Sequence, residues 1–166
     1  MPKSSIPFAV ATGAALTAAT GALALPPAPR KTASCEPGKP SVMVHVAGFK
    51  QPRGKVKLSL YGSEGDWLEK GGRISRVKVP VTGKAMNICL PVPAPGRYAV
   101  AVHHDLNLNG ERDRQDGGGY SRNPKVSLLN PRPSFSKAAF KVGNGRSKIG
   151  VTLLYIQGLG VGPAGS

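Results

Sequence analysis

The chain has 166 residues, with 23 Lys and Arg against 8 Asp and Glu, and its formal net charge is +15. It contains 22 Gly and 16 Pro, 5% of its residues are aromatic, and 40% are hydrophobic. Such a composition is rich in turns yet apolar enough to form a core, which excludes a disordered chain and a helical bundle. After the first 25 residues no apolar run is long enough to cross a bilayer, so the mature chain is predicted to lack a transmembrane helix. One small domain is expected.

Residues 1–24 have the pattern of a secretory signal peptide. One early cation, Lys3, is followed by an uncharged run of apolar and small residues that ends in Ala22-Leu23-Ala24, a sequence typical of a signal-peptidase site. A retained membrane anchor is disfavoured because Gly and Thr make the run only weakly hydrophobic. We therefore expect cleavage after Ala24 and export of the mature chain to the periplasm or the cell exterior.

Residues 25–40 are rich in Pro and basic residues and are expected to form an extended lead-in to the domain. The chain has two cysteines, Cys35 and Cys89. In an oxidising compartment an even number of cysteines favours a disulfide, and this one would tie the lead-in to a strand. Two cysteines so far apart are poor evidence for a zinc site.

From Ser41 onward, short runs of alternating apolar and polar residues are separated by Gly and Pro, which predicts β-strands. In residues 55–61 the apolar side chains fall on one face, and Lys57 and Ser59 fall on the other, which is expected to face water. Pro80 places its strand at the edge of a sheet. The expected strands are 42–46, 55–61, 74–81, 86–90, 97–104, 140–142 and 149–155. Seven short strands predict an all-β, two-sheet sandwich over residues 41–157.

The segments between and after these strands carry weaker patterns. One helical turn is expected over residues 134–139 with Ser134 as its N-cap. Residues 117–119 are three glycines and are expected to act as a hinge, and the Gly-rich tail at 158–166 is expected to be flexible. Trp67 belongs either to the core or to an exposed contact, and we favour the core because tryptophan is usually largely buried.

Four of the eight acidic residues lie within residues 105–116, which makes this loop the most distinctive feature of a basic chain. Oxygen-bearing side chains stand at loop positions 1, 3, 5, 9 and 12, and Gly110 stands at position 6, as in calcium loops of the EF-hand type. The main-chain carbonyl of Glu111 would supply position 7. Ca²⁺ binds oxygen ligands, whereas zinc would favour His or Cys. The candidate ligands are Asp105, Asn107, Asn109, Glu111, Asp113 and Asp116.

Three features of the loop depart from that pattern. Position 12 holds Asp116 where a longer Glu is usual, Arg112 and Arg114 lie inside the loop, and a strand precedes it where a helix would be expected. The affinity for calcium should therefore be reduced. The alternative is an Asx-rich turn whose side chains bond only their own backbone. We favour the ion because a turn alone does not require an oxygen at every alternate position.

Three segments resemble the bacterial exported domain-of-unknown-function 2141 family. They are HDLNLNGERD at residues 104–113, GYSRNP at 119–124 and PSFSKAAF at 133–140. The resemblance extends from about residue 41 to residue 155. It implies an exported β-sandwich of immunoglobulin-like or transthyretin-like appearance, and it implies no established activity.

These observations favour a binding or structural module over an enzyme. No Gly-x-Ser-x-Gly motif and no phosphate-binding glycine motif occurs in the sequence. The first hypothesis is a non-enzymatic module stabilised by Ca²⁺ at residues 105–116. The second is a basic protein that binds an anionic envelope surface or polymer without specific nucleic-acid recognition, because aromatic residues are too few to stack bases. The sequence indicates neither a natural ligand nor an oligomeric state.

A third hypothesis is a metal-dependent enzyme that uses His104 with Asp105 and Asp113. His103 and His104 are adjacent on an expected strand, so their side chains should point to opposite faces and at most one can join the loop. This hypothesis requires His104 to lie within hydrogen-bond reach of a loop carboxylate.

Overall fold

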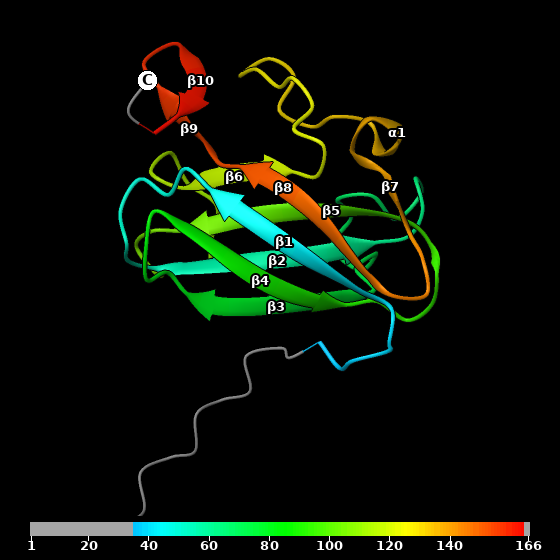
Figure 1. Ribbon diagram of the computed structural model, residues 1–166. Coiled ribbons are helices and arrows are strands. Elements are labelled where there is room, and N and C mark those ends of the chain that lie inside the picture. The colour runs from blue at the N-terminus through cyan, green and yellow to red at the C-terminus, as the bar shows by residue number, and fades with distance from the viewer. Residues whose placement is uncertain (1–34, 165–166) are drawn as a thin grey trace, which may run out of the picture.

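A computed structural model describes residues 35–164 (Figure 1). The predicted signal peptide and the first part of the lead-in lie outside these residues. The described elements, in chain order, are β1 (Ser41–Ala47), β2 (Lys55–Tyr61), β3 (Ser75–Pro80), β4 (Ala85–Pro91), β5 (Gly96–Asp105), β6 (Gly117–Tyr120), α1 (Phe135–Ala138), β7 (Phe140–Val142), β8 (Arg146–Thr152), β9 (Leu154–Gln157) and β10 (Gly160–Pro163).

The strands form two sheets, which confirms the predicted all-β sandwich. The smaller sheet has the order β4-β1-β8, with β1 antiparallel to β4 and parallel to β8. The larger sheet has the order β10-β9-β6-β5-β2-β3, and β7 pairs with the start of β5. In Figure 1 the strands of the smaller sheet lie diagonally across those of the larger one. The edge position predicted for the strand that contains Pro80 is confirmed by β3.

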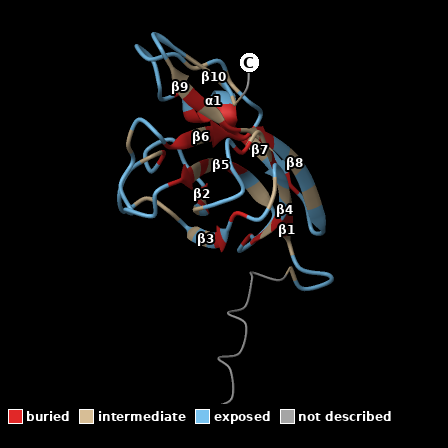
Figure 2. Ribbon diagram, turned by 90° about the vertical axis from the view of Figure 1, so that its left-hand side faces the viewer, coloured by how far each residue is buried: buried red, intermediate tan, exposed pale blue. Residues whose placement is uncertain are grey.

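The core lies between the two sheets, where the period-two pattern of each strand directs its apolar side chains. Val42, Val44 and Val46 of β1 belong to the same buried cluster as Leu58 and Leu60 of β2. Figure 2 views the sandwich from the side and shows buried residues along the strands of both sheets.

A second apolar cluster covers part of the other face of the larger sheet. It contains Trp67 together with Tyr61, Tyr120 and Phe135, the first residue of α1. Trp67 is 9% exposed, and its Nε1 donates a hydrogen bond to the carbonyl of Pro133 at 2.7 Å. The expected burial of this tryptophan is confirmed, although it packs outside the space between the sheets.

The helical turn is also found, but its predicted cap is wrong in detail. Ser134 occupies the N-cap position of α1 without a capping hydrogen bond from its side chain. Its hydroxyl is instead 3.0 Å from the hydroxyl of Ser136. The turn is held by burial of Phe135 and Ala138 against the second cluster.

The predicted hinge at residues 117–119 is wrong because these glycines form most of β6, between β5 and β9. They are required for close packing: a Cβ atom at Gly117 would lie 2.5 Å from the ring of Tyr155, and one at Gly119 would lie 2.7 Å from Val151. Glycine here makes room for neighbouring strands and is part of a regular ladder.

The end of the chain differs from the prediction in two ways. The run 149–155 divides into β8 and β9, which belong to different sheets, and Leu153 between them donates its N–H to the carbonyl of Ala47 at 2.9 Å. Residues 160–163, which were expected to belong to a flexible tail, form β10 antiparallel to β9. A short strand can leave one sheet and enter another without any break in its apolar pattern.

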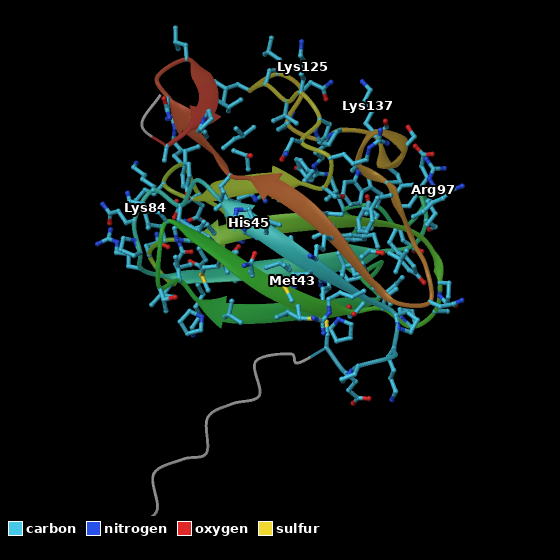
Figure 3. The ribbon with its side chains drawn as sticks, in the orientation of Figure 1. Met43, His45, Lys84, Arg97, Lys125 and Lys137 are labelled. Atoms are coloured by element: carbon cyan, nitrogen blue, oxygen red, sulfur yellow. A yellow bond between two sulfur atoms is a disulfide. The ribbon has the colours of Figure 1, made fainter. Side chains whose placement is uncertain are left out.

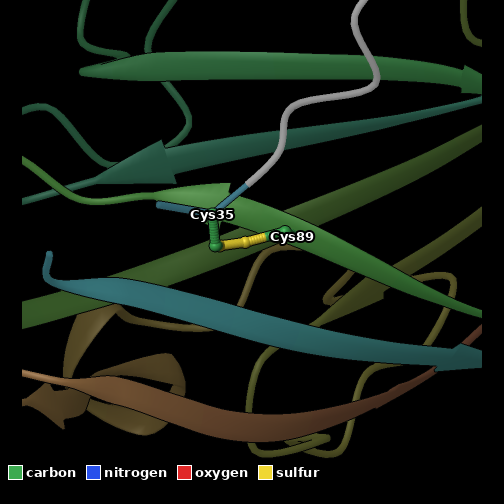
Figure 4. The surroundings of a disulfide bond; sticks show 2 residues. All are labelled: Cys35 and Cys89. Atoms are coloured by element: carbon green, nitrogen blue, oxygen red, sulfur yellow. A yellow bond between two sulfur atoms is a disulfide. The ribbon is translucent and has the colours of Figure 1, made fainter. Parts of the chain in front are cut away.

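A disulfide joins Cys35 to Cys89, with the two Cα atoms 5.7 Å apart (Figure 4). It connects the segment before β1 to β4, as the cysteine count predicted. Within residues 35–164, no helix has the length and apolarity that crossing a membrane would require.

Candidate functional site

The acidic loop connects β5 to β6, two neighbouring strands of the larger sheet. Asp105 is the last residue of β5, and Asp116 immediately precedes β6. Both are almost fully buried, at 2% and 6% exposure. The first and twelfth positions of the loop therefore lie at its base, where the strands hold them.

Asp105 is bound by a cation from the neighbouring strand β2. Its Oδ2 lies 2.8 Å from Nζ of Lys57 and accepts a hydrogen bond from the N–H of Gly110 at 3.2 Å. Lys57 also donates to the carbonyl of Gly110 at 3.1 Å. Burial tends to raise the pKa of Asp105, but the Lys57 ammonium and the Gly110 N–H outweigh burial and hold the pKa below its ordinary value. The other carboxylate oxygen, Oδ1, is buried without a hydrogen-bond partner.

Asp116 closes the base of the loop. Its Oδ1 accepts the N–H of Leu106 at 3.0 Å. Its Oδ2 is 2.7 Å from Nε2 of His103 and also accepts the N–H of Asp113 at 3.4 Å. Both oxygens are thus engaged by donors of the protein, and the carboxylate ties β5 to the end of the loop.

The remaining candidate ligands form a polar group farther out in the loop. The side-chain amides of Asn107 and Asn109 donate to Oδ2 of Asp113 at 2.7 and 2.9 Å, and the N–H of Gln115 donates to its Oδ1 at 2.8 Å. The Gln115 N–H and then the Asn107 amide lower the pKa of Asp113. The side-chain oxygens of Asn107 and Asn109 accept N–H groups two residues onward, and the side chain of Glu111 is exposed.

The structure thus brings together the two carboxylates at the base and separately gathers Asn107, Asn109 and Asp113. In the part of the chain that the structure describes, no three His, Cys, Asp or Glu side chains are placed as a metal-binding group. Any cation in this loop would need ligands from amide and main-chain oxygens as well. Calcium accepts such mixed oxygen ligands.

Lys57 is the residue beside the loop that the sequence pattern did not indicate. It was expected to face water, but its side chain is 11% exposed because the loop folds over it. No local sequence pattern predicts the contact of Lys57 with Asp105, because Asp105 lies 48 positions later in the chain. The available signal was two lysines in this strand of a protein whose largest acidic cluster lies at residues 105–116.

Comparison with known protein families identifies a family for this chain. A bacterial family described as an uncharacterized protein conserved in bacteria, DUF2141, matches residues 44–150, which is more than half of the chain. The chain belongs to the DUF2141 family. No curated protein and no solved structure matches it.

The match confirms the resemblance that the sequence suggested, and its span runs from β1 into β8. All six candidate ligands of the loop therefore lie inside the residues that match the family. The description of the family gives no activity, so any function must come from the chemistry of the site.

The two adjacent histidines point to opposite faces of β5, as predicted. His103 contacts Asp116 on the loop side. Burial is the largest effect and lowers the pKa of His103; the hydrogen bond with Asp116 raises the pKa, and the charge of Arg112 lowers it. His104 is fully buried on the core side, and burial lowers its pKa as well.

Both ring nitrogens of His104 are engaged. Nε2 donates to the carbonyl of Arg53 at 2.8 Å, and Nδ1 accepts the hydroxyl of Tyr155 at 2.7 Å. That hydroxyl in turn accepts the N–H of Lys50 at 3.1 Å. The His104–carboxylate contact that a metal-dependent enzyme would need is absent from this arrangement.

Proposed function

We propose that this DUF2141 protein is an exported, non-enzymatic β-sandwich module in which residues 105–116 bind Ca²⁺ as a structural ion. The disulfide supports export to an oxidising compartment, the periplasm or the cell exterior. The ion would stabilise the connection between β5 and β6 and would carry out no chemical step.

One observation carries the proposal. Oδ1 of Asp105, at the first position of the loop, is a buried carboxylate oxygen without a hydrogen-bond partner. Such an atom loses its hydration without compensation, which costs free energy unless a cation or donor reaches it. The other oxygen of the same carboxylate already holds a cation, the Lys57 ammonium. The base of the loop is therefore a place where positive charge is stabilised.

The remaining ligands would come from the loop itself. Ca²⁺ takes about six to eight oxygens. Asp105 would supply one carboxylate, and Asn107 and Asn109 would supply amide oxygens after rotation of their side chains away from Asp113. Lys57 would then compete with the ion for the carboxylate of Asp105. This competition and the Asp at position 12 both predict modest affinity.

Thermal unfolding of the exported protein, first in chelator and then in calcium at constant ionic strength, tests the proposal. At about a hundredfold excess over the dissociation constant, binding to the folded state adds about 2.7 kcal/mol. For a domain of this size the melting temperature should rise by several degrees. Asp105→Asn should abolish the rise, whereas Glu69→Gln, which changes an exposed acid outside the loop, should retain it. If the melting temperature did not change in calcium, the proposal would be contradicted and residues 105–116 would be interpreted as an Asx-rich turn without an ion.

A second candidate function, binding of an anionic envelope surface or polymer, is supported by the distribution of cations. The formal net charge is +15, and Lys84, Arg97, Lys125 and Lys137 lie around the periphery of the sandwich (Figure 3). Charges spread in this way favour attraction to a polyanion without a defined binding geometry. Retention on heparin should weaken steeply as salt is added, because screening acts on exposed charges. Retention that is independent of salt would contradict this candidate.

A further inference from the structure

The outer face of the larger sheet, which the smaller sheet does not cover, contains a cavity of about 230 Å³. Its floor is formed by β2 and β5, through Lys57, Ser59 and His103 among others. Its rim comes from Arg76 of β3 and from the two loops on either side of β6, through Arg112 and Arg132. The cavity adjoins the acidic loop, but its lining includes no carboxylate.

The charge of this lining is strongly unbalanced. Lys57 and His103 face carboxylates of the acidic loop, Asp105 and Asp116. Arg76, Arg112 and Arg132, in contrast, form no ion pair with any residue from 35 to 164. Three guanidinium groups thus border one hollow without a protein counterion.

Arg76 is held by a hydrogen bond, and Arg112 lies close to β6. Nε of Arg76 donates to the hydroxyl of Ser59 at 3.2 Å, which holds the guanidinium against the floor. Partial burial, and then the nearby Arg73, lower the pKa of Arg76, so an anion at this place would relieve an unfavourable environment. Arg112 lies against β6, where a Cβ atom at Gly118 would be 3.2 Å from its Nη2.

The walls add an apolar component. Leu68, Tyr61 and Tyr120 line the cavity, and the hydroxyl of Tyr120 is held by the carbonyl of Pro131 at 2.9 Å. Both tyrosines belong to the cluster packed around Trp67, which fixes their rings. A site with fixed aromatic walls and several guanidinium groups suits an organic anion better than a bare inorganic ion.

We propose that this cavity binds a small organic anion that carries a phosphate or several carboxylate groups. Arginine side chains donate paired hydrogen bonds to either group. The volume is below the range of about 300 to 1,000 Å³ for pockets that enclose drug-sized ligands, which selects a ligand no larger than a sugar phosphate or a tricarboxylate. The cavity shares Lys57 and Arg112 with the acidic loop and its surroundings, but the proposed binding of an anion does not require calcium.

Calorimetric titration of the whole exported protein at constant ionic strength tests the proposal. The probes are glucose 6-phosphate and citrate, with glucose as the uncharged control and heparin as the polymeric one. We expect one of the two anions to bind saturably with one ligand per chain, and glucose not to bind. The double variant Arg112→Gln and Arg132→Gln should weaken that binding by about tenfold or more, because each lost charge-assisted hydrogen bond is worth that much.

A matched double variant, Lys125→Gln and Lys137→Gln, removes the same charge from positions away from the cavity lining. It should change the affinity by less than about twofold, because these exposed cations are screened. Equal weakening by both double variants would overturn the proposal in favour of general attraction to positive charge. Binding of heparin alone, or no saturation by either small anion at about 10 mM, would overturn it as well.

Discussion

Successive residues of β2 point to opposite faces of the larger sheet, and the two faces contact different parts of the molecule. The inner face, with Val56, Leu58 and Leu60, is fully buried against the smaller sheet. The outer face, with Lys57 and Ser59, is covered by loops and lines a polar cavity. Regular strand packing thus fixes the inner face, whereas the outer face holds the ionisable groups that a ligand would contact. Both the contact of Lys57 with the acidic loop and the cavity lie on the outer face.

Leu58→Ala against Ser59→Ala tests this contrast with adjacent residues. The inner substitution leaves a void in a close-packed core and should lower the free energy of unfolding by about 2 to 5 kcal/mol. The outer substitution removes the hydrogen bond from Arg76 and should lower it by about 1 kcal/mol. Urea unfolding of both variants measures the difference. Equal losses would show that the outer face is packed as tightly as the core.

Tyr155→Phe probes the buried polar link beneath the loop. The hydroxyl of Tyr155 donates to His104 and accepts from Lys50, so its removal leaves two groups without a partner. We expect a loss of about 2 kcal/mol in the free energy of unfolding. Tyr98→Phe, which removes one hydrogen bond to the carbonyl of Ala94, is the control and should cost less. If Tyr98→Phe lowered the free energy of unfolding more than Tyr155→Phe, the hydrogen bonds of the Tyr155 hydroxyl would not have the importance assigned to them.

Acidification should destabilise the protein through its two adjacent histidines. Burial lowers the pKa of His103 and of His104 in the folded state, so the unfolded chain binds protons more readily. The contribution of the two neutral histidines to the free energy of unfolding is fully present above the pKa of histidine in the unfolded chain, about 6.5. It decreases as the pH falls below that value, by up to about 1.4 kcal/mol per pH unit for each histidine.

Urea unfolding between about pH 7.5 and pH 5 measures this slope, since carboxylates titrate mainly below that window. His104→Gln should reduce the slope and leave the contribution of His103. Stability that stays constant or rises on acidification would contradict the burial of both rings as the controlling effect.

The inner half of the sandwich could be predicted from sequence because local alternation determines which side chains enter a core. The strand at 55–61 and the edge position of Pro80 both followed from patterns within a few residues. The outer face could not be predicted, because the cover over Lys57 comes from a loop that lies far along the chain. The separation of residues 149–155 into β8 and β9 was also not predicted, because the alternation of apolar residues continues through Leu153, where the chain passes from one sheet to the other.

The geometry of the acidic loop also could not be predicted from sequence alone. Spacing alone grouped all six candidate ligands, whereas the structure separates the buried pair, Asp105 and Asp116, from the outer group around Asp113. It also adds Lys57, whose ammonium occupies one oxygen of Asp105. Sequence specifies which oxygens are available, but strand pairing decides which of them a cation can reach together.

Calorimetric titration of calcium into the wild-type protein and into Lys57→Met is the most direct test of calcium binding by the acidic loop. If the loop binds Ca²⁺ through Asp105, removal of the competing ammonium should tighten the binding, and wild-type protein should bind one ion per chain more weakly. Each tenfold gain in affinity corresponds to about 1.4 kcal/mol. We expect saturable binding in both proteins, tighter in Lys57→Met. Absence of saturable calcium binding in both would contradict it and make Lys57 the permanent counterion of the loop.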